Sequence, residues 1–360
     1  MDVLLDGTPL LGPRTGIGQY VTNLYRSLHD RPDVVPRLYA FTIRHGSRPA
    51  DVHRGDWSRR VLPARVLQRL WLSRDWPTAD LLLPRADVLH ATNFTSPPAR
   101  RARRVVTVHD LAFARLPDLV HPQTRRAAEL TARQARTADA VLTPSAAVAA
   151  EIQEHLGIPA DRVHVTPLGV DPAWTAAAPP DVAWLARHGL PSAYLLAVGT
   201  REPRKNLAAL VAAHRAARPE GVLPLVLVGP PGWGEEVVAG DGVHLLPYLP
   251  ATELRSLVAG ATALVFPSRY EGFGLPALEA LAAGTPVLAN DIPVLREVLG
   301  DCGRFVDADD RDALAAALVA AGVAPDRPGE RAGRQRRAAS FTWARCAEST
   351  VAAYRAAGAG

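Results

Sequence analysis

Short apolar runs alternate with amphipathic stretches along the whole of this 360-residue chain. The short runs predict buried strands, and the stretches between them carry apolar residues at helical spacing. This alternation is typical of parallel βαβ units, whose sheets are covered by helices on both faces. We therefore expect an α/β fold, with strands near residues 3–6, 38–43, 88–90, 105–108, 140–143, 195–199, 225–229, 244–247, 263–266, 286–289 and 304–306.

The length predicts two domains, because 360 residues are too many for one ordinary hydrophobic core. A turn-rich segment of small residues and prolines at 172–181 suits the boundary between them. We expect residues 1–172 and 173–343 to form two doubly wound domains.

Several classes of protein are disfavoured by the composition. The two cysteines, Cys302 and Cys346, have neither CxxC nor zinc-ligand spacing, which indicates reduced structural thiols. No apolar stretch approaches the ~20 residues of a membrane span, and a strand begins directly after Met1. We expect a cytoplasmic protein. The net charge of +5 is modest, and the basic run 100–104 lacks interleaved aromatic residues, so we predict no nucleic-acid partner.

Lys205 is the only lysine among the 41 basic residues. Either a compact ammonium is needed at this position in place of a planar guanidinium, or one lysine has survived by chance. Asn206 follows it, so the loop is not the phosphate-binding loop of an ATPase. The sequence Gly16-Ile-Gly18 lacks the third glycine of a dinucleotide fingerprint, and no hydrolase or zinc-protease motif occurs.

A strand-to-helix turn at residues 271–279 carries two carboxylates and two glycines. Gly272 and Gly274 allow backbone amides to approach an anion at the positive end of the helix. Glu271 in the loop and Glu279 in the first helical turn could each accept two hydrogen bonds from vicinal hydroxyls, as in ribose or a hexose. The alternative is that Glu279 only complements the helix dipole and Glu271 is solvated.

The ends of that helix are marked by Pro276, which suits its first turn, and by Gly284, where it should stop. Three further loops, 12–18, 107–110 and 199–206, follow predicted strands. Ligands of open α/β sheets bind at the carboxyl ends of strands, so all of these loops could face one interdomain cleft.

Each loop also has a plainer interpretation. Gly16 could be an ordinary turn residue, His109 a buried core histidine and Arg204 a surface charge. Asp307-Ala-Asp309 resembles a metal-binding DxD motif, but its place before a helix at 312–321 favours helix capping. The proline-rich segment 229–234 predicts a shaped turn.

Segment 54–76 predicts a basic amphipathic helix that carries tryptophans and aliphatic residues. Such a helix could lie among lipid headgroups, with a lipid or lipid-linked acceptor nearby, or could pack on the core with a solvated basic face.

Together these motifs resemble the large family of retaining, nucleotide-sugar-dependent glycosyltransferases with the GT-B fold, typified by bacterial cell-envelope mannosyltransferases. The resemblance runs from the Gly-Ile-Gly loop to Phe341-Thr-Trp343. It implies two Rossmann-like domains facing an interdomain cleft, with a final helix near 344–360 that packs back on the first. It rests on Gly199-Thr-Arg-Glu-Pro-Arg-Lys-Asn206, Ser268-Arg-Tyr-Glu-Gly-Phe-Gly-Leu-Pro-Ala-Leu-Glu279, Ala283-Gly-Thr-Pro-Val287, Val108-His-Asp110 and Leu168-Gly-Val-Asp-Pro172.

The resemblance also implies roles for individual residues. Glu271 would contact the donor sugar, Glu279 the ribose, and Arg204 and Lys205 the diphosphate. His109 would lie beside the transferred sugar. The remaining donor contacts would come from Gly16, Gly18, Gly199, Tyr248, Leu249, Gly272, Phe273, Gly274 and Leu275, with base recognition by backbone around Tyr248 and Leu249. The loop departs from the family pattern at Arg201, where similar loops often carry an apolar residue.

We therefore expect a retaining hexosyltransferase that needs no metal or other cofactor. GDP-mannose is the favoured donor and a UDP-sugar the next. The expected acceptor is a cell-envelope glycan, lipid or lipid-linked sugar, reached at the inner face of the membrane if segment 54–76 binds lipid. The alternatives are a nucleotide-sugar epimerase of the same architecture and a nucleotide-sugar-binding protein without transfer activity.

Overall fold

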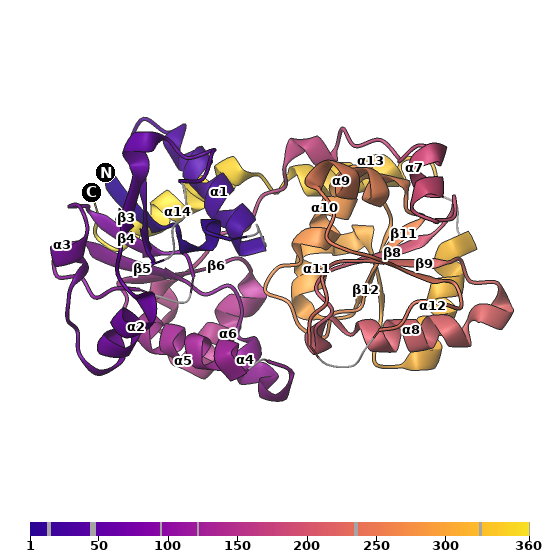
Figure 1. Cartoon of the computed structure of the whole chain (residues 1–360), viewed down its shortest axis with the longest axis horizontal. Coiled ribbons are helices and arrows are strands. Elements are labelled where there is room, and N and C mark those ends of the chain that lie inside the picture. Colours follow the sequence, from indigo (N-terminus) through magenta and orange to yellow (C-terminus); the bar gives the residue numbers. More distant parts are fainter. Residues whose placement is uncertain are drawn as a thin grey trace. The chain divides into compact units, whose positions relative to one another are not determined.

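The chain forms two compact units, each with one parallel sheet between layers of helices (Figure 1). The computed structural model describes residues 1–12, 16–43, 48–93, 96–120, 122–233, 237–323 and 326–359. The first unit contains residues 1–115, 122–169 and 342–360, and the second contains 116–121 and 170–341. The C-terminal residues therefore return to the first unit. The sequence did not indicate that 116–121 would group with the second unit.

The first unit is built on a seven-stranded sheet in the order β3-β2-β1-β4-β5-β6-β7, with every pair parallel. Helices α1 (Gly16–His29) and α14 (Trp343–Ala356) pack together on one face. The other face carries α2 (Ala64–Ser73), α3 (Ala79–Leu82), α5 (Pro122–Arg136) and α6 (Ala146–Leu156) (Figure 1). The strands are β1 (Asp2–Asp6), β2 (Val35–Phe41), β3 (Trp57–Arg60), β4 (Val88–Ala91), β5 (Arg103–Thr107), β6 (Ala140–Thr143) and β7 (Val163–Val165).

The second unit has a six-stranded parallel sheet in the order β10-β9-β8-β11-β12-β13. Helices α8 (Leu207–Ala216) and α12 (Arg311–Val323) pack together over one face, where they bury the core against the strands. Helices α9 (Ala251–Gly260), α10 (Leu275–Ala283) and α13 (Glu330–Ala339) form a second layer, and α7 (Val182–Arg187) and α11 (Pro293–Leu299) complete the unit. The strands are β8 (Leu195–Val198), β9 (Leu225–Val228), β10 (Val243–Leu246), β11 (Ala263–Phe266), β12 (Val287–Asn290) and β13 (Gly303–Val306).

Both ends of α10 are set by glycines in the left-handed region, Gly274 at φ 94° and Gly284 at φ 80°. The predicted helix end at Gly284 is confirmed. Arginines of α13 then bond the terminal carbonyls at that end: Arg331 donates to the carbonyl of Ala283, and Arg334 donates twice to that of Gly284. Because these carbonyls have no partner within the helix, the arginines fix the far end of α10.

Segment 54–76 was predicted as one amphipathic helix, and this is wrong. It contains a short 3-10 turn, strand β3 and then α2. Leu67 and Trp71 of α2 are buried in the core of the first unit, whereas Val66 and Trp76 are half exposed or more. The core-packing interpretation therefore holds for the apolar face of α2.

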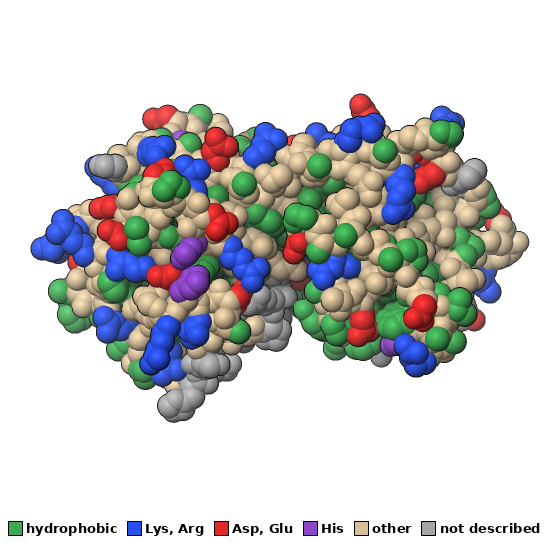
Figure 2. Space-filling model, turned by 90° about the horizontal axis from the view of Figure 1, so that it is seen from above, with side chains coloured by type: hydrophobic (Ala, Val, Ile, Leu, Met, Phe, Trp, Pro, Cys, Tyr) green, Lys and Arg blue, Asp and Glu red, His purple; other side chains and the backbone are tan. Residues whose placement is uncertain are grey.

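Figure 2 shows blue basic side chains scattered among red acidic ones on the visible face. Of the helices in the described residues, none has the length and apolar character that a bilayer crossing requires.

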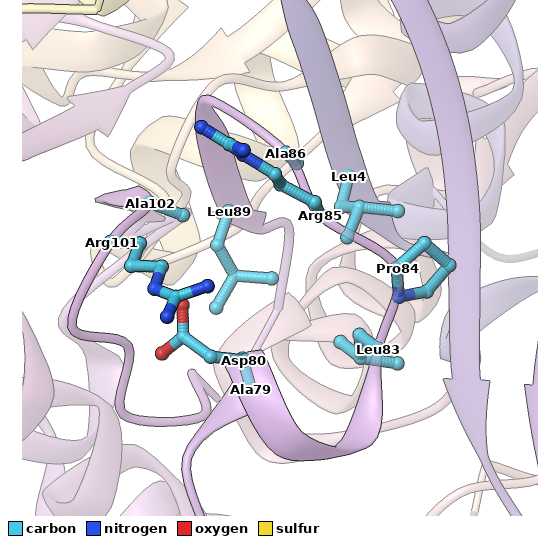
Figure 3. Close-up of a pocket in the computed structure, with 10 residues that line it drawn as sticks. All are labelled: Leu4, Ala79, Asp80, Leu83, Pro84, Arg85, Ala86, Leu89, Arg101 and Ala102. Carbon is cyan, nitrogen blue, oxygen red and sulfur yellow. The ribbon is translucent and has the colours of Figure 1, made fainter.

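A small cavity of about 50 Å³ lies in the first unit, lined by residues such as Leu4, Leu89, Asp80 and Arg101 (Figure 3). Two other lining residues, Ala86 and Ala102, lie one or two positions before β4 and β5 begin. The cavity is therefore at the amino ends of the strands, away from the carboxyl ends where ligands of such sheets bind.

Candidate functional site

The loops that carry the candidate residues of the second unit follow two neighbouring strands. Strands β8 and β11 lie side by side, and the chain runs outward from them in opposite directions along the sheet. The point between them is the topological switch point, where doubly wound sheets bind ligands. Loop 199–206 follows β8 and loop 267–274 follows β11, so sheet order brings these two loops together.

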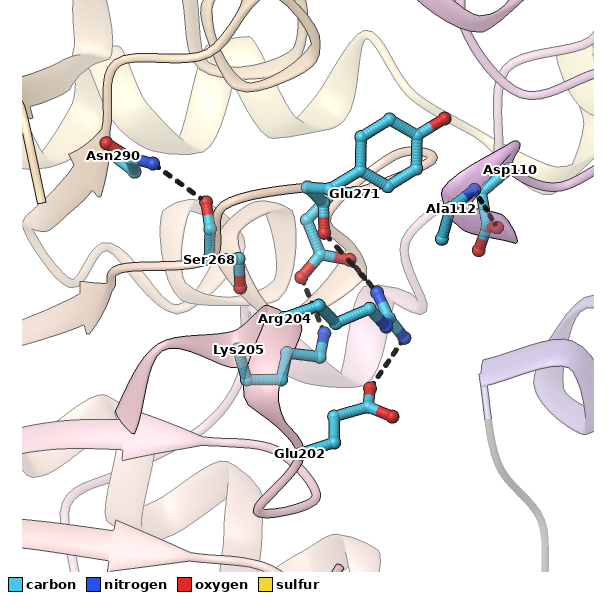
Figure 4. Close-up of polar contacts among 9 residues, drawn as sticks. Asp110, Ala112, Glu202, Arg204, Lys205, Ser268, Glu271 and Asn290 are labelled. Atoms are coloured by element: carbon cyan, nitrogen blue, oxygen red, sulfur yellow. Dashed lines mark hydrogen bonds and ion pairs between the residues drawn. The ribbon is translucent and has the colours of Figure 1, made fainter. Parts of the chain in front are cut away.

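A compact ion-paired cluster forms where the two loops meet (Figure 4). Lys205 Nζ lies 2.5 Å from Glu271 Oε1, and Arg204 Nη1 lies 3.3 Å from Glu271 Oε2. Arg204 Nη2 is also 2.8 Å from Glu202 Oε1. The side chains of Glu271 and Lys205 are only 8% and 13% exposed, so these charges interact with little screening by water. The structure thus brings Glu271, Arg204 and Lys205 into one site.

The electrostatics of Glu271 follow from this cluster. Burial alone would raise the pKa of Glu271, but Lys205 and then Arg204 outweigh burial and hold the pKa below its ordinary value. Glu271 is therefore ionised at neutral pH, with both oxygens already accepting from cations.

Loop 199–206 is held in place by its neighbours. A Cβ on Gly229 would lie 2.1 Å from the carbonyl oxygen of Gly199, and one on Gly232 would lie 2.2 Å from that of Arg201. These glycines let the predicted turn at 229–233 pack directly on the loop, while Gly234 lies outside the described residues. Asn206, in the left-handed region at φ 57°, donates to the carbonyl of Ala308. The side chains of Arg204 and Lys205 therefore project from a supported backbone.

Glu279 lies in the second turn of α10, because the helix begins at Leu275, and not in the first turn as predicted. Its side chain is buried, and burial raises its pKa to about 8. At neutral pH Glu279 is therefore protonated in the free protein. A protonated carboxyl group can donate one hydrogen bond and accept others, which still suits a pair of hydroxyls.

We expect Glu279→Gln to stabilise the free protein at alkaline pH. A carboxyl group whose pKa is raised on folding, here from 4.5 to about 8, stabilises the fold below its unfolded pKa and loses this contribution as pH rises towards 8. Glutamine has no proton to lose. Thermal unfolding should show Glu279→Gln melting a few degrees above the unchanged protein at pH 8.5 and close to it at pH 5. Equal melting temperatures at pH 8.5 would contradict the buried, protonated state.

His109 follows β5 in the first unit and is held by the end of the neighbouring strand. Its Nε2 lies 2.8 Å from the carbonyl oxygen of Thr92, which can only accept, so Nε2 carries the proton. Burial lowers the pKa of His109, so the ring is neutral at neutral pH and Nδ1 is an acceptor. His109 also lines a small cavity of about 40 Å³ together with Ile17, Asp110 and Phe113.

A buried hydrogen-bonded chain lies behind His109. The Tyr354 hydroxyl of α14 is 2.7 Å from His90 Nδ1, and His90 Nε2 is 2.7 Å from Thr107 Oγ1. Tyr20 Oη is 3.1 Å from the same Thr107 oxygen, and the rings of Tyr20 and His109 form a T-shaped pair with centroids 5.0 Å apart. The C-terminal helix thereby supports the position of His109 within its own unit.

The other predicted site residues lie at strand and helix ends. Gly16 and Gly18 are in the first turn of α1, and the loop residues 13–15 before them lie outside the described residues. Tyr248, 62% exposed, and the buried Leu249 follow β10. Gly272, Phe273, Gly274 and Leu275 form the turn into α10, and Gly199 directly follows β8.

The sequence missed Glu202 and misjudged the acidic run after β13. Glu202 lies two residues before Arg204, and its negative charge in a loop at a strand end was the available signal. Asp310, not Asp307 or Asp309, caps α12, by accepting from the backbone amides of Asp312 and Ala313. Asp309 instead accepts from Arg269. No group of His, Cys, Asp or Glu side chains suited to hold a metal ion occurs among the described residues.

Known proteins resemble this chain over nearly its whole length. The family model for Glycosyltransferase Family 4 matches residues 14–174, and that for Glycosyl transferases group 1 matches residues 192–321. O-antigen chain mannosyltransferase B of Escherichia coli is 30% identical over 392 residues, covering 99% of this chain and 100% of that protein. The MMP alpha-(1->4)-mannosyltransferase of Mycolicibacterium hassiacum is 36% identical over 242 residues, covering 63% of this chain and 56% of that protein.

Solved structures share the architecture at lower identity. Sucrose-phosphate synthase of Thermosynechococcus elongatus superposes with a TM-score of 0.72 at 20% identity, covering 99% of this chain and 98% of that one. Anabaena Alr3699/HepE in complex with UDP-glucose gives a TM-score of 0.70 at 16% identity, covering 98% of each chain.

Two Rossmann-like units with parallel sheets, matched in this way along the chain, define the GT-B fold. The chain belongs to the family of group 1 and family 4 glycosyltransferases. The predictions of a GT-B fold and of a hexosyltransferase are confirmed.

Proposed function

We propose that the ion-paired cluster at the switch point of the second unit is the donor site for a nucleotide-diphosphate sugar. The observation that carries this proposal is the convergence of Arg204, Lys205 and Glu271 beside the N-terminus of α10. The two cations and the positive end of the helix suit a diphosphate. Glu271, ionised and buried, suits hydroxyls of the sugar, and the protonated Glu279 suits those of the ribose.

The chemistry of transfer fits these assignments. The bond between the sugar and the diphosphate breaks as the sugar becomes oxocarbenium-like, and the negative charge that develops on the diphosphate is stabilised by Arg204 and Lys205. We propose that transfer retains the anomeric configuration, with the acceptor hydroxyl attacking from the face that the leaving phosphate occupies and giving it the proton. In this scheme the protein's own cations stabilise the leaving group without a metal ion. His109, whose Nδ1 can accept, would take a hydrogen bond from a hydroxyl of the transferred sugar.

We favour a mannosyl group as the transferred hexose, GDP-mannose as the donor and a cell-envelope glycan or lipid-linked sugar as the acceptor. The full-length similarity to an O-antigen chain mannosyltransferase supports this choice. A UDP-sugar is the second candidate, because a structural neighbour was solved with UDP-glucose. Base contacts would come from the segment around Tyr248 and Leu249.

A thermal-shift panel of GDP-mannose, UDP-glucose, GDP and UDP tests the proposal. A ligand at 100 times its Kd stabilises the folded state by about 2.7 kcal/mol. The nucleotides that carry the recognised base should therefore raise the melting temperature clearly. GDP-mannose is expected to give the largest shift, and Lys205→Ala should abolish it. If neither nucleotide sugar raises the melting temperature, or if the Lys205→Ala variant shows the same rise, this donor site is excluded.

We also propose that the enzyme acts in the cytoplasm and contacts the inner face of the membrane through segment 54–76. The exposed Val61, Val66 and Trp76 lie in the same segment as Arg59, Arg60, Arg69 and Arg74. Co-sedimentation with vesicles containing an anionic lipid tests this contact. Equal recovery with neutral and anionic vesicles would contradict an electrostatic contribution.

A further inference from the structure

The donor cluster contains one acidic residue for which the proposed chemistry has no use. Glu202 Oε1 lies 2.8 Å from Arg204 Nη2, and its side chain is only 10% exposed. Arg204 therefore lies between two carboxylates, because its Nη1 contacts Glu271. Figure 4 shows Glu202 and Glu271 on opposite sides of the Arg204 guanidinium.

The formal charges of these four side chains cancel: Arg204 and Lys205 are positive, and Glu202 and Glu271 are negative. Cationic side chains that served only to hold a diphosphate as tightly as possible would not need a second buried carboxylate beside them. Its negative charge opposes an incoming anion at a place where water screens poorly. The cluster is thus less attractive to anions than its two cations suggest.

The repulsion between Glu202 and the bound anion differs between the donor and the product. The diphosphate of a nucleotide sugar is esterified at both ends. After transfer, the released nucleoside diphosphate has a terminal phosphate that can ionise a second time near neutral pH. A fixed negative charge beside Arg204 therefore disfavours the product more than the donor.

We propose that Glu202 is a counter-charge that positions Arg204 and weakens the hold of the donor site on the released nucleoside diphosphate. This inference rests on the proposed function, in which Arg204 and Lys205 contact the diphosphate. Glu202 touches no substrate in this scheme and acts through Arg204. Its effect is on the balance between donor binding and product release.

Glu202→Gln tests the inference, because it removes the charge and keeps the size of the side chain. Calorimetric titration with GDP and with UDP should show tighter binding of the recognised diphosphate by about threefold to tenfold, the effect of one nearby charge. The same fold-change should appear in its inhibition constant during transfer, whereas KM for the nucleotide sugar should fall less. The difference from the unchanged enzyme should largely persist as salt is added, because salt screens buried charges far less than exposed ones.

Two further variants test whether the effect comes from the charge of Glu202 itself. One changes the shape of this side chain and keeps its charge, and the other makes the same change in net charge elsewhere. Glu202→Asp keeps the negative charge and should bind the diphosphate about as the unchanged enzyme does. Glu220→Gln makes the same change in net charge at an exposed position beyond the far end of α8 and should change nothing. Tightening by Glu202→Asp or by Glu220→Gln equal to that by Glu202→Gln would overturn the inference.

Lys205→Ala separates this inference from the proposed function. If Lys205→Ala weakens diphosphate binding but Glu202→Gln does not strengthen it, the inference is wrong and the donor site stands. If Lys205→Ala leaves diphosphate binding unchanged, both are wrong.

Discussion

Lys205→Ala is expected to lower kcat/KM for sugar transfer by about 10³-fold, because two contributions are lost together. The ammonium group no longer stabilises the leaving diphosphate. The buried carboxylate of Glu271 also loses its closer cation, at 2.5 Å, so its pKa should rise towards its ordinary value or above. The activity of the variant should therefore show an acidic limb displaced to higher pH.

Steady-state kinetics between pH 5 and 9 would check this result, with circular dichroism to confirm the fold. Lys205→Arg is the informative companion. It keeps the charge in a chain that otherwise uses arginine throughout, but a planar guanidinium cannot replace a compact ammonium at the same contact. We expect only partial recovery. Arg215→Ala removes an exposed cation of α8 and serves as the control. Transfer by Lys205→Ala at the unchanged rate would refute the role of Lys205.

Glu271→Gln is expected to lower transfer by about 10²- to 10³-fold while the nucleoside diphosphate binds more tightly. The first effect follows from the loss of a charged acceptor for the sugar hydroxyls. The second follows because Lys205 and Arg204 lose the carboxylate that both of them contact in the free protein. Affinity for the product and the rate of transfer should thus change in opposite directions.

Titration with the nucleoside diphosphate measures its affinity, and kinetics with the nucleotide sugar measure the rate of transfer. Both measurements can be made on one preparation. Glu253→Gln, a glutamate of α9 that accepts from Trp184, provides a matched substitution away from the cluster. Weaker binding of the diphosphate by Glu271→Gln would show that Glu271 organises the two cations more than it opposes the anion. Normal transfer would remove Glu271 from the donor site.

Most of the fold could be predicted because its signals are local. Strands such as Ala140–Thr143 and Ala263–Phe266 are short, wholly buried and almost entirely apolar, and they were predicted at their observed bounds. Strands β3 and β7 were missed. Trp57–Arg60 ends in Ser-Arg-Arg and is only partly buried, so its sequence lacks the apolar pattern of a central strand. Its place at the edge of the sheet allows polar residues that a central strand would exclude.

The site was predicted less completely, because contacts between distant loops have no local signal. Arg204, Lys205 and Glu271 were predicted as separate contacts to one ligand, and sixty-odd residues separate the two motifs. Nothing in either motif indicates that the cations and the carboxylate bind each other in the free protein. For the same reason the part played by Glu202 could not be inferred, although the residue lies inside a recognised loop.

Glu279 is a second residue whose position could be predicted from the sequence but whose protonation state could not. The motif gives its spacing from Glu271, but its pKa depends on burial by the layers around α10 and on Asp171, more than one hundred residues earlier in the chain. The parallel α/β units, the loops at the carboxyl ends of their strands and the residue types of a donor site follow from the amino-acid sequence, because periodicity and turn chemistry act over a few residues. Which charges cancel, which carboxyl group keeps its proton and which atom of His109 can accept follow from the folded chain, because these properties depend on burial and on partners that strand order brings together.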